Sequence, residues 1–286
     1  GYGQLGSAGS NSSRPVQVVT GAQGSASGYL EKVVELDAAS EDSSSYGTSI
    51  AVTESKEVYG WGYSGFGPLG QTGTFTSPIK VSNINTAVGV ALGGTSSTQF
   101  TYILKEDGTI ASLGYNGYGQ LGQGNTTTVY SPVQVKSADG SSYLTDIIEI
   151  AAGAYHNLAL AKDGTVWSWG YGSNGGLGNG KTSNSSLPVK VIGVSDVVSI
   201  AAGYYNSFAV RKDGTVWAWG YNNYGQLGLG NDANGTTAQQ VVGGASGSQY
   251  LTDIVEVKAA TWHTLALKAN GTVYAWGYNN YGQLGS

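Results

Sequence analysis

Residues 151–178 read Ala-Ala-Gly-Ala-Tyr-His-Asn-Leu-Ala-Leu-Ala-Lys-Asp-Gly-Thr-Val-Trp-Ser-Trp-Gly-Tyr-Gly-Ser-Asn-Gly-Gly-Leu-Gly, and the same pattern returns in 201–228 and 259–285. Looser copies occupy 93–122 and 38–70. The last element, Gly-x-Leu-Gly, places leucines at 5, 69, 121, 177, 227 and 284, at intervals of 50 to 64 residues. Self-similarity at such a period indicates a repeat architecture in which each copy is one supersecondary unit.

One copy predicts a four-stranded antiparallel sheet. Residues 147–151 form an apolar first strand, and 157–161 a second strand with alternating polarity. Asp163-Gly164 makes the hairpin turn, because both residue types tolerate positive φ, and 166–169 is the return strand. Residues 188–191 form an edge strand that begins with a proline, where no ladder hydrogen bond is lost. Such sheets in series predict an all-β fold, a β-propeller of about five four-stranded blade repeats.

A small-residue step precedes the second strand of each copy. It reads Ala-Ala-Gly at 151–153 and 201–203, and is weakened at 92–94 and 259–261. We expect it to let neighbouring backbones approach closely, because glycine carries no Cβ.

The complete string, from Ala-Ala-Gly through Asp-Gly-Thr-Val and Trp-Gly to Gly-Gln-Leu-Gly, strongly resembles the repeat of the regulator of chromosome condensation family. The resemblance covers essentially the whole chain and implies a β-propeller, usually of seven blades. It implies no single activity, since the family includes a nucleotide-exchange factor for a small GTPase, secreted inhibitors of β-lactamase and domains of larger proteins.

The repeat count departs from that family norm. We expect one repeat domain over 1–286, with repeat cores at about 33–70, 87–122, 147–178, 196–228 and 254–285. Three interpretations stay open: a closed ring of five with a surplus terminal copy, a segment of a longer repeat protein, and an open array completed by neighbouring chains. Head-to-tail contacts that do not close generate filaments. The element at the start returns at the end, so the candidate terminal assembly motifs are Tyr2 and Leu5, and Tyr281 and Leu284.

A second pattern alternates along the chain. Repeats one, three and five carry an extra element ahead of the first strand, at 27–30, 141–144 and 248–251, which the other two repeats lack. A strict alternation cannot run around a closed ring of five, so it favours a longer array or an assembly, with independent loop variation as the alternative.

Composition excludes several classes of protein. Glycine contributes 47 of 286 residues, only 11% are charged, and aromatic residues reach 11%, which excludes a mainly disordered chain. The net charge is −5, with the 13 Lys and Arg scattered, so no basic surface for nucleic acid is indicated. Cysteine and methionine are absent, so no disulfide or thiolate ligand forms; no membrane span is expected, and we expect an extracellular or cell-surface location.

No catalytic, cofactor or metal site emerges from the residue types. His156 and His263 occupy the same place in two repeats, with Asn206 near that place in a third, which favours a structural role. Residues 231–235 offer oxygen ligands for Ca²⁺ but lack the full loop signature, so a polar loop is favoured. The Gly-rich turns lack the Gly-Lys-Ser/Thr of a phosphate cradle. We therefore predict a protein without enzyme activity and without cofactors.

Aromatic side chains carry the candidate function. They recur after the Ala-Ala-Gly step and around the Trp-Gly to Gly-x-Leu-Gly turn, and packing between blades is the competing explanation. Tyrosine and tryptophan bury large areas with few rotatable bonds, which suits interface anchors. The candidate interaction surface comprises Tyr155, Tyr204, Tyr205, Trp262, Tyr118, Tyr224 and Tyr281. The candidate N-glycosylation acceptors are Asn11, Asn125, Asn184, Asn234 and Asn270.

The expected function is a non-catalytic extracellular structural or interaction propeller that self-assembles head-to-tail through its terminal motifs. The expected partner is a protein or a second copy, with no nucleic acid. The alternatives are a soluble binding or inhibitor propeller that uses an aromatic face, and a nucleotide-exchange factor for a small GTPase.

Overall fold

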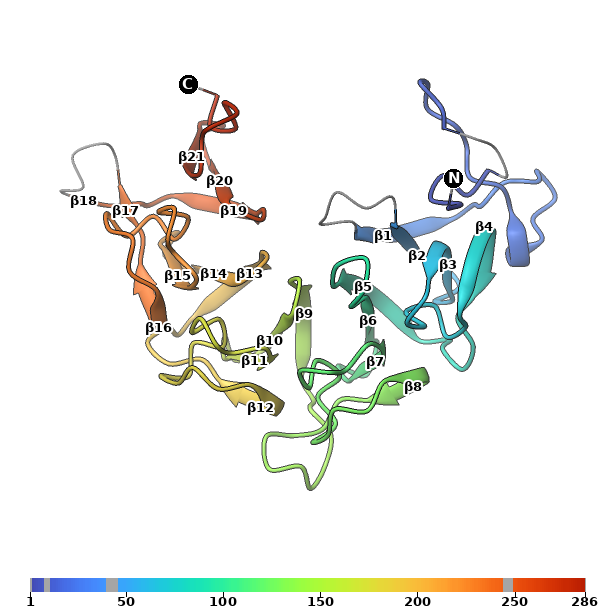
Figure 1. Cartoon of the computed structure of the whole chain (residues 1–286), viewed down its shortest axis with the longest axis horizontal. Helices are drawn as coiled ribbons and strands as arrows, with labels where there is room; N and C mark the ends of the chain where they lie inside the picture. The colour runs from blue at the N-terminus through green and yellow to red at the C-terminus, as the bar shows by residue number, and fades with distance from the viewer. Residues whose placement is uncertain (1, 8–10, 40–45, 244–248, 286) are drawn as a thin grey trace. The chain divides into compact units, whose positions relative to one another are not determined.

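The computed structural model describes residues 2–7, 11–39, 46–243 and 249–285, and the described chain is almost entirely β-structure (Figure 1). Two compact units are present, Gly1–Asp146 and Ile147–Ser286. In both units short antiparallel sheets follow one another in chain order, which confirms the predicted blades of a β-propeller. The prediction of one domain over 1–286 stays a prediction.

Unit 1 holds a short 3₁₀ helix, Gly21–Gln23, and two four-stranded sheets, here called blades 1 and 2. In each blade every strand pairs with the next one along the chain. Blade 1 comprises β1 (Val33–Ala39), β2 (Thr48–Thr53), β3 (Val58–Ser64) and β4 (Gly73–Lys80). Blade 2 comprises β5 (Ala87–Gly93), β6 (Phe100–Lys105), β7 (Ile110–Gly114) and β8 (Val129–Gln134).

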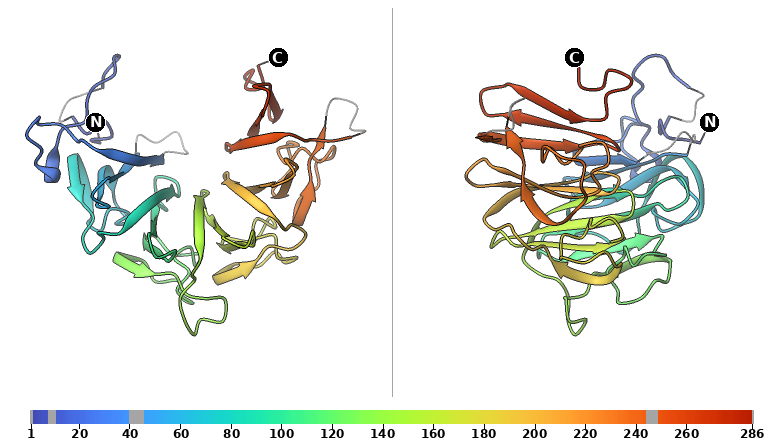
Figure 2. Two further views of the ribbon diagram at one scale, coloured as in Figure 1. Left: turned by 180° about the vertical axis from the view of Figure 1, so that it is seen from behind. Right: turned by 60° about the vertical axis from the view of Figure 1, so that its left-hand side comes forward.

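Unit 2 holds blades 3, 4 and 5, whose sheets lie side by side in the right-hand view of Figure 2. Blade 3 comprises β9 (Ile147–Ala152), β10 (His156–Ala161), β11 (Val166–Gly170) and β12 (Ser185–Lys190). Blade 4 comprises β13 (Val197–Ala202), β14 (Asn206–Arg211), β15 (Val216–Gly220) and β16 (Gly235–Gln240). Blade 5 comprises β19 (Ile254–Ala259), β20 (His263–Lys268) and β21 (Val273–Gly277), after a short hairpin of β17 (Val242–Gly243) and β18 (Gln249–Tyr250).

Blade 5 differs from the other four because its sheet has three strands within the described part of the chain. The valine or isoleucine that opens the third strand is 0% exposed at Val58 and Val216, whereas Val273 is 60% exposed. In blade 4 the backbone N–H of Val241 donates to the carbonyl of Val216, just beyond the outer strand. Among the described residues, β21 has no such neighbour on its outer edge.

The hydrophobic cores lie between successive blades of the same unit. Alternating side chains of β10 and β14, among them Leu158 and Ala209, join one core of blades 3 and 4. Phe208 and Val216 of blade 4 pack with Val257 of blade 5 in another. In unit 1 the shared core of blades 1 and 2 is lined by Ile50, Val52, Val90, Leu92 and Ile103. Each sheet thus buries one face on its neighbour, as blades of a propeller must.

The Asp-Gly-Thr hairpin turns also join one blade to the next. Gly214 has φ of 76°, and its carbonyl accepts the N–H of Ile254, the first residue of blade 5. Gly164 makes the equivalent turn beside Asp196, which precedes blade 4. Asp146, Asp196 and Asp253, each directly ahead of a first strand, adopt positive φ themselves. The turn residues were expected from the sequence, but their contact with the following blade was not.

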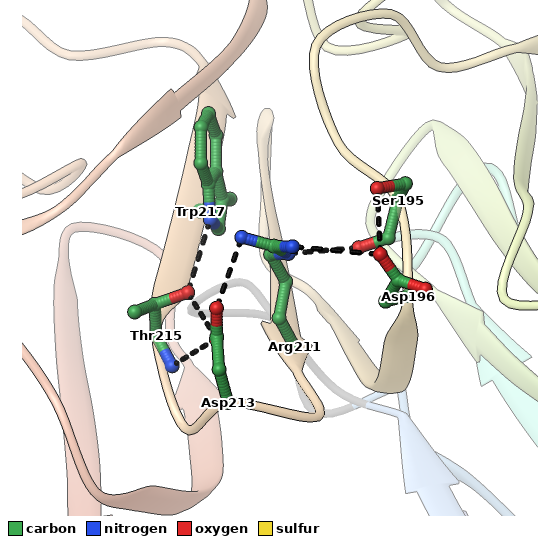
Figure 3. Close-up of polar contacts among 6 residues, drawn as sticks. All are labelled: Ser195, Asp196, Arg211, Asp213, Thr215 and Trp217. Carbon is green, nitrogen blue, oxygen red and sulfur yellow. Dashed lines mark hydrogen bonds and ion pairs between the residues drawn. The ribbon is translucent and has the colours of Figure 1, made fainter.

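A polar cluster closes the turn of blade 4 (Figure 3). The Asp213 carboxylate accepts hydrogen bonds from the hydroxyl and the backbone N–H of Thr215, at 2.6 and 3.0 Å, and these bonds lower its pKa. Arg211 Nη1 lies 3.0 Å from Asp213 Oδ2, and Arg211 Nε donates to the Ser195 carbonyl at 2.9 Å. Asp163 and Thr165 repeat the turn bond in blade 3 at 2.9 Å. The aspartates therefore shape turns, as their spacing indicated.

The extra element of alternate repeats is a short hairpin. Tyr29 and Tyr143 each form a single bridge with Val19 and Lys136, and Tyr250 pairs with Val242 in β17–β18. The leucine that follows each tyrosine donates its N–H to the valine carbonyl that ends the outer-strand segment, at Val18, Val135 and Val241. The three elements are therefore equivalent, as their sequences indicated.

The register of the small-residue step in blade 5 corrects the sequence alignment. The N–H of Gly153 donates to the His156 carbonyl, and the N–H of Gly203 to the Asn206 carbonyl. In blade 5 the equivalent bond runs from Ala260 to His263, so Ala260, not Thr261, takes the place of the glycine. Close approach is confirmed between blades 3 and 4, since a methyl group on Gly153 would lie 2.3 Å from the Gly203 carbonyl oxygen.

Candidate interaction surface

A repeated backbone hydrogen bond holds two aromatic side chains together in each blade of unit 2. The N–H of Tyr171 donates to the Tyr155 carbonyl at 2.9 Å, and that of Tyr221 to the Tyr205 carbonyl at 3.0 Å. In blade 5 the N–H of Tyr278 donates to the Trp262 carbonyl at 2.8 Å. One aromatic residue precedes the second strand and the other follows the third, so the pair lies at the same end of each sheet.

The pairs of successive blades make ring contacts with one another. Tyr155 stacks on Tyr205 with ring centroids 5.3 Å apart and planes 13° from parallel, and its hydroxyl lies 3.3 Å from that of Tyr204. Tyr204 stacks on Trp262 at 5.7 Å. Trp262 also meets Tyr224 at 5.4 Å, so blades 3, 4 and 5 share one continuous aromatic cluster.

The aromatic cluster of unit 2 is defined by these contacts. Its members are Tyr155, Tyr171, Tyr204, Tyr205, Tyr221, Tyr224, Trp262, Tyr278 and Tyr281. Most of the rings are half-buried against one another, while Tyr224 is 47% and Tyr281 87% exposed. Both expectations for the aromatic residues therefore hold in part, because the rings pack between blades and still present area to solvent.

The structure brings together six of the seven predicted surface residues. Tyr155, Tyr204, Tyr205, Trp262, Tyr224 and Tyr281 belong to the cluster. Tyr118 lies in unit 1, where its ring meets Tyr115 at 6.2 Å. Tyr171, Tyr221 and Tyr278 were not nominated for the surface, although their place after Trp-Gly in three successive repeats was the signal that could have found them.

Glutamines of the Gly-Gln-Leu-Gly loops orient the tyrosines two residues ahead of them. The N–H of Tyr224 donates to Gln226 Oε1 at 2.9 Å, and Tyr281 donates to Gln283 at the same distance. Asn222 supports the same loop, because its Oδ1 accepts the Leu227 N–H and its Nδ2 donates to the Asn231 carbonyl, both at 2.8 Å. Residues 231–235 therefore serve as a polar loop.

The N-terminal motif packs on blade 1 and is hydrogen-bonded to it. Trp61 Nε1 donates to the Gln4 carbonyl at 2.9 Å, as Trp276 Nε1 donates to the Gln226 carbonyl between blades 4 and 5. Tyr2 packs on Tyr46 with ring centroids 4.5 Å apart, and a side-chain hydrogen bond to Tyr46 raises the pKa of Tyr2. Leu5 is exposed and Leu284 half-buried, whereas the equivalent leucines inside the chain, such as Leu227, are buried.

The two histidines differ in environment. His156 is buried, and Nε2 lies 2.7 Å from Ser207 Oγ of blade 4; burial lowers its pKa to about 4. His263 is half-buried. Glu149 also reaches from blade 3 to blade 4, where the Ile200 N–H and the Ser199 hydroxyl each bond it at 3.1 Å, while burial raises its pKa. His156 and Glu149 therefore join blades 3 and 4.

Three further features concern metal ligands, membrane spans and sequons among the described residues. No group of three or more His, Asp or Glu side chains is arranged to hold a metal ion in the part of the chain that the structure describes. Among those residues no helix has the length and hydropathy of a membrane span. All five sequon asparagines, Asn11, Asn125, Asn184, Asn234 and Asn270, are exposed.

The chain is similar in sequence to a known protein family and to curated proteins. A family model described as the RCC1-like domain matches residues 1–286. The chain is 30% identical to the ultraviolet-B receptor UVR8 of Arabidopsis thaliana over 243 residues, which cover 83% of this chain and 52% of UVR8.

Two solved structures show the same fold. Human WBSCR16 superposes with a TM-score of 0.72 at 20% identity, over 88% of this chain and 63% of that one. Prp20p of Saccharomyces cerevisiae, described with its binding to Gsp1p and histones, superposes with a TM-score of 0.67 at 22% identity, over 83% and 56% of the two chains. The chain spans about half the length of UVR8 and Prp20p.

Proposed function

The chain belongs to the RCC1-like domain family, and from that premise we propose that it is a non-catalytic β-propeller that binds a protein through the aromatic cluster of unit 2. The observation that carries the proposal is the continuity of the cluster across three blades, from Tyr155 through Trp262 to Tyr281. Rings held by a backbone ladder lose little conformational freedom on binding, so their area contributes to affinity. Prp20p, a protein of the same fold, supports a protein as the partner class.

Charge supports a protein partner over a nucleic acid. The chain carries a net charge of −5. Nucleic-acid binding draws its affinity largely from lysine and arginine on phosphates, whereas the 13 Lys and Arg of this chain are outnumbered by 18 Asp and Glu. Tyrosine hydroxyls at its edge supply hydrogen bonds, which suits the mixed apolar and polar surface of a protein.

The test is a comparative capture experiment. The wild-type protein, a Tyr204→Ala/Trp262→Ala double variant and a Tyr250→Ala control are immobilised and exposed to an extract of the source organism. Tyr250 is a matched control because it is an exposed tyrosine of the same unit outside the cluster. Proteins retained by the wild type and the control but lost with the double variant support the proposal. Equal retention by all three would refute it.

Head-to-tail self-assembly is the second candidate, and one observation favours it. β21 presents an unpaired edge within the described residues, beside a cavity of about 600 Å³ lined in part by Asp232, Tyr274 and Trp276. A strand added to such an edge would complete a four-stranded blade.

The self-assembly proposal is tested by light scattering and negative-stain electron microscopy of concentrated protein. Filaments that vanish in a Val273→Lys variant, which charges the open edge of β21, support it. A Val255→Lys control carries the same charge on an exposed position of β19 and should leave the filaments intact. A monodisperse monomer of 29.3 kDa at high concentration would exclude self-assembly.

For the compartment we propose an extracellular or cell-surface setting. The support is the absence of cysteine and methionine together with five exposed sequon asparagines. Enzymatic deglycosylation of native material tests it: a loss of mass supports the proposal, and an unmodified chain recovered from the cytosol would overturn it.

A further inference from the structure

One position recurs at the start of the second strand in every blade of unit 2. It is occupied by His156, Asn206 and His263, which lie opposite Gly170, Gly220 and Gly277 in the registers of blades 3, 4 and 5. In blades 3 and 4 the side chain at this position lies at the junction with the following blade. Blade 3 has a histidine at this position, whereas blade 4 has an asparagine.

At the junction of blades 3 and 4 the imidazole of His156 and the hydroxyl of Ser207 both have hydrogen-bond partners. His156 Nε2 lies 2.7 Å from Ser207 Oγ, and the Ser207 hydroxyl donates to the Gly176 carbonyl at 3.0 Å. Trp219 Nε1 donates to the same carbonyl at 3.0 Å. The imidazole therefore spans the junction and ends on a hydroxyl of the next blade.

The junction of blades 4 and 5 repeats the hydrogen bonds to the loop carbonyl, but Asn206 replaces the longer histidine side chain. The Thr264 hydroxyl and Trp276 Nε1 both donate to the Gln226 carbonyl at 2.9 Å, as Ser207 and Trp219 do to Gly176. Asn206 stands in the place of His156, is 1% exposed, and finds no hydrogen-bond partner for either Oδ1 or Nδ2. A carboxamide is shorter than an imidazole and does not span the same gap.

The Asn206 carboxamide oxygen and the Ala260 carbonyl oxygen border one small space beside Gly203. A methyl group on Gly203 would lie 2.3 Å from Asn206 Oδ1 and 2.7 Å from the Ala260 carbonyl oxygen, so both oxygens border it. Gln226 is fully buried, and its Nε2 has no partner although its Oε1 accepts the Tyr224 N–H. Gly176 takes the place of Gln226 in blade 3, and a methyl group on Gly176 would lie 3.9 Å from the His156 ring. By this equivalence, the Cβ of Gln226 lies next to the side chain of Asn206.

Buried polar atoms without partners are rare because each costs on the order of 1–3 kcal/mol. Water satisfies such groups where a buried site is polar and offers two to four partners. We propose that blades 4 and 5 bind a buried water molecule between Asn206, Gln226 and Thr264, in the place that the distal imidazole nitrogen of His156 takes one blade earlier. The water accepts from Gln226 Nε2 and donates to the Asn206 carboxamide and to the free lone pair of the Thr264 hydroxyl.

The first test is a crystal structure of the 286-residue protein at about 1.5 Å. The expected result is a density peak within about 2.6–3.2 Å of Gln226 Nε2 and of the Asn206 carboxamide. The proposal is overturned if the site is dry and these groups bond to protein atoms instead.

Reciprocal variants give a second test that does not depend on one structure. In Asn206→His the imidazole should displace the water and reach Thr264, and the melting temperature should rise by about 2–4 °C. In His156→Asn a new water should appear beside Ser207, which copies the arrangement of blade 4. Water retained beside the new histidine, or a dry junction in His156→Asn, would contradict the proposal. Because the two variants alter separate junctions, a folding failure of one leaves the other decisive.

Discussion

The indole nitrogen of Trp219 lies 3.0 Å from the carbonyl oxygen of Gly176, so the buried tryptophan of blade 4 is tied to the loop that leaves blade 3. The same bond joins Trp61 to Gln4 and Trp276 to Gln226. Two motifs that the sequence repeats separately, Trp-Gly and Gly-x-Leu-Gly, are thus partners across blade junctions.

Trp219→Phe should lower the free energy of unfolding by about 1–3 kcal/mol, because it removes a buried hydrogen bond together with part of a close-packed ring. Trp217→Phe is the control, since Trp217 is half-buried and its Nε1 bonds only the Thr215 hydroxyl at 3.3 Å in the described contacts. Urea denaturation followed by circular dichroism measures both. Equal losses would mean that the junction bond contributes nothing beyond ring burial.

Acid should weaken unit 2 through His156. Its pKa is lowered to about 4 by burial, whereas an unfolded histidine titrates near 6.5. The unfolded chain therefore binds a proton first as the pH falls, so stability present above pH 6.5 is lost between about 6.5 and 4, by about 3 kcal/mol. The measurement is the free energy of unfolding against pH for the wild type and His156→Asn. Parallel curves for the two proteins would show that His156 is not the group responsible.

Alanine substitutions at two turn glycines can distinguish the cost of backbone strain from the cost of a steric clash with the next blade. Gly214 and Gly271 have φ of 76° and 87° in equivalent turns, but only Gly214 abuts a following blade, where a methyl group would lie 2.9 Å from the Asp253 nitrogen. Gly271→Ala should cost about 1 kcal/mol from the left-handed backbone alone. Gly214→Ala should cost about 1–3 kcal/mol more, because overpacking is added. Thermal unfolding of both variants measures the two losses of stability. A smaller loss for Gly214→Ala than for Gly271→Ala would contradict a contact between the turn and blade 5.

Lys32 offers a stabilising substitution. It directly precedes β1 with φ of 53°, where three other blades place an aspartate in the same conformation. Lys32→Gly should raise the free energy of unfolding by up to about 1 kcal/mol, because glycine carries no Cβ penalty there. Lys32→Ala, which keeps the Cβ, should bring no gain. A melting temperature that falls in Lys32→Gly but not in Lys32→Ala would refute the strain argument.

Much of the fold could be predicted from local sequence. Strand alternation and the Asp163-Gly164 turn act within a few residues, so the first three strands of blade 3 lie where the pattern put them. The fourth strand was misplaced, because β12 runs from Ser185 to Lys190 and Pro188 lies inside it rather than at its start. The extra elements at Tyr29, Tyr143 and Tyr250 were also visible, because their residues repeat at a fixed place, although the sequence did not show that they form hairpins. The register of blade 5 was misjudged because Ala259, Ala260 and Thr261 are too alike in size to show which one is the step.

The candidate site could be predicted only in part. Repetition identified the aromatic positions, and six of seven nominated residues do meet. The bond from Tyr171 to Tyr155 follows from the Asp163-Gly164 hairpin. The ring contacts between blades, such as Tyr155 on Tyr205, depend on how separate sheets pack, which no local pattern encodes. The same is true of His156, whose role was expected to be structural but whose partner, Ser207, lies in another blade.

The sequence by itself determined the repeat, its strands and turns, and the aromatic residues that each blade carries, because these follow from side-chain periodicity and from the backbone freedom of glycine and aspartate. Only the tertiary structure decided which residues meet across a junction. Those contacts depend on how one sheet packs on the next, so a histidine that bonds a serine in blade 3 is replaced in blade 4 by an asparagine with unpartnered atoms. Burial and distance, which arise only when the blades pack, separate these two chemically similar positions.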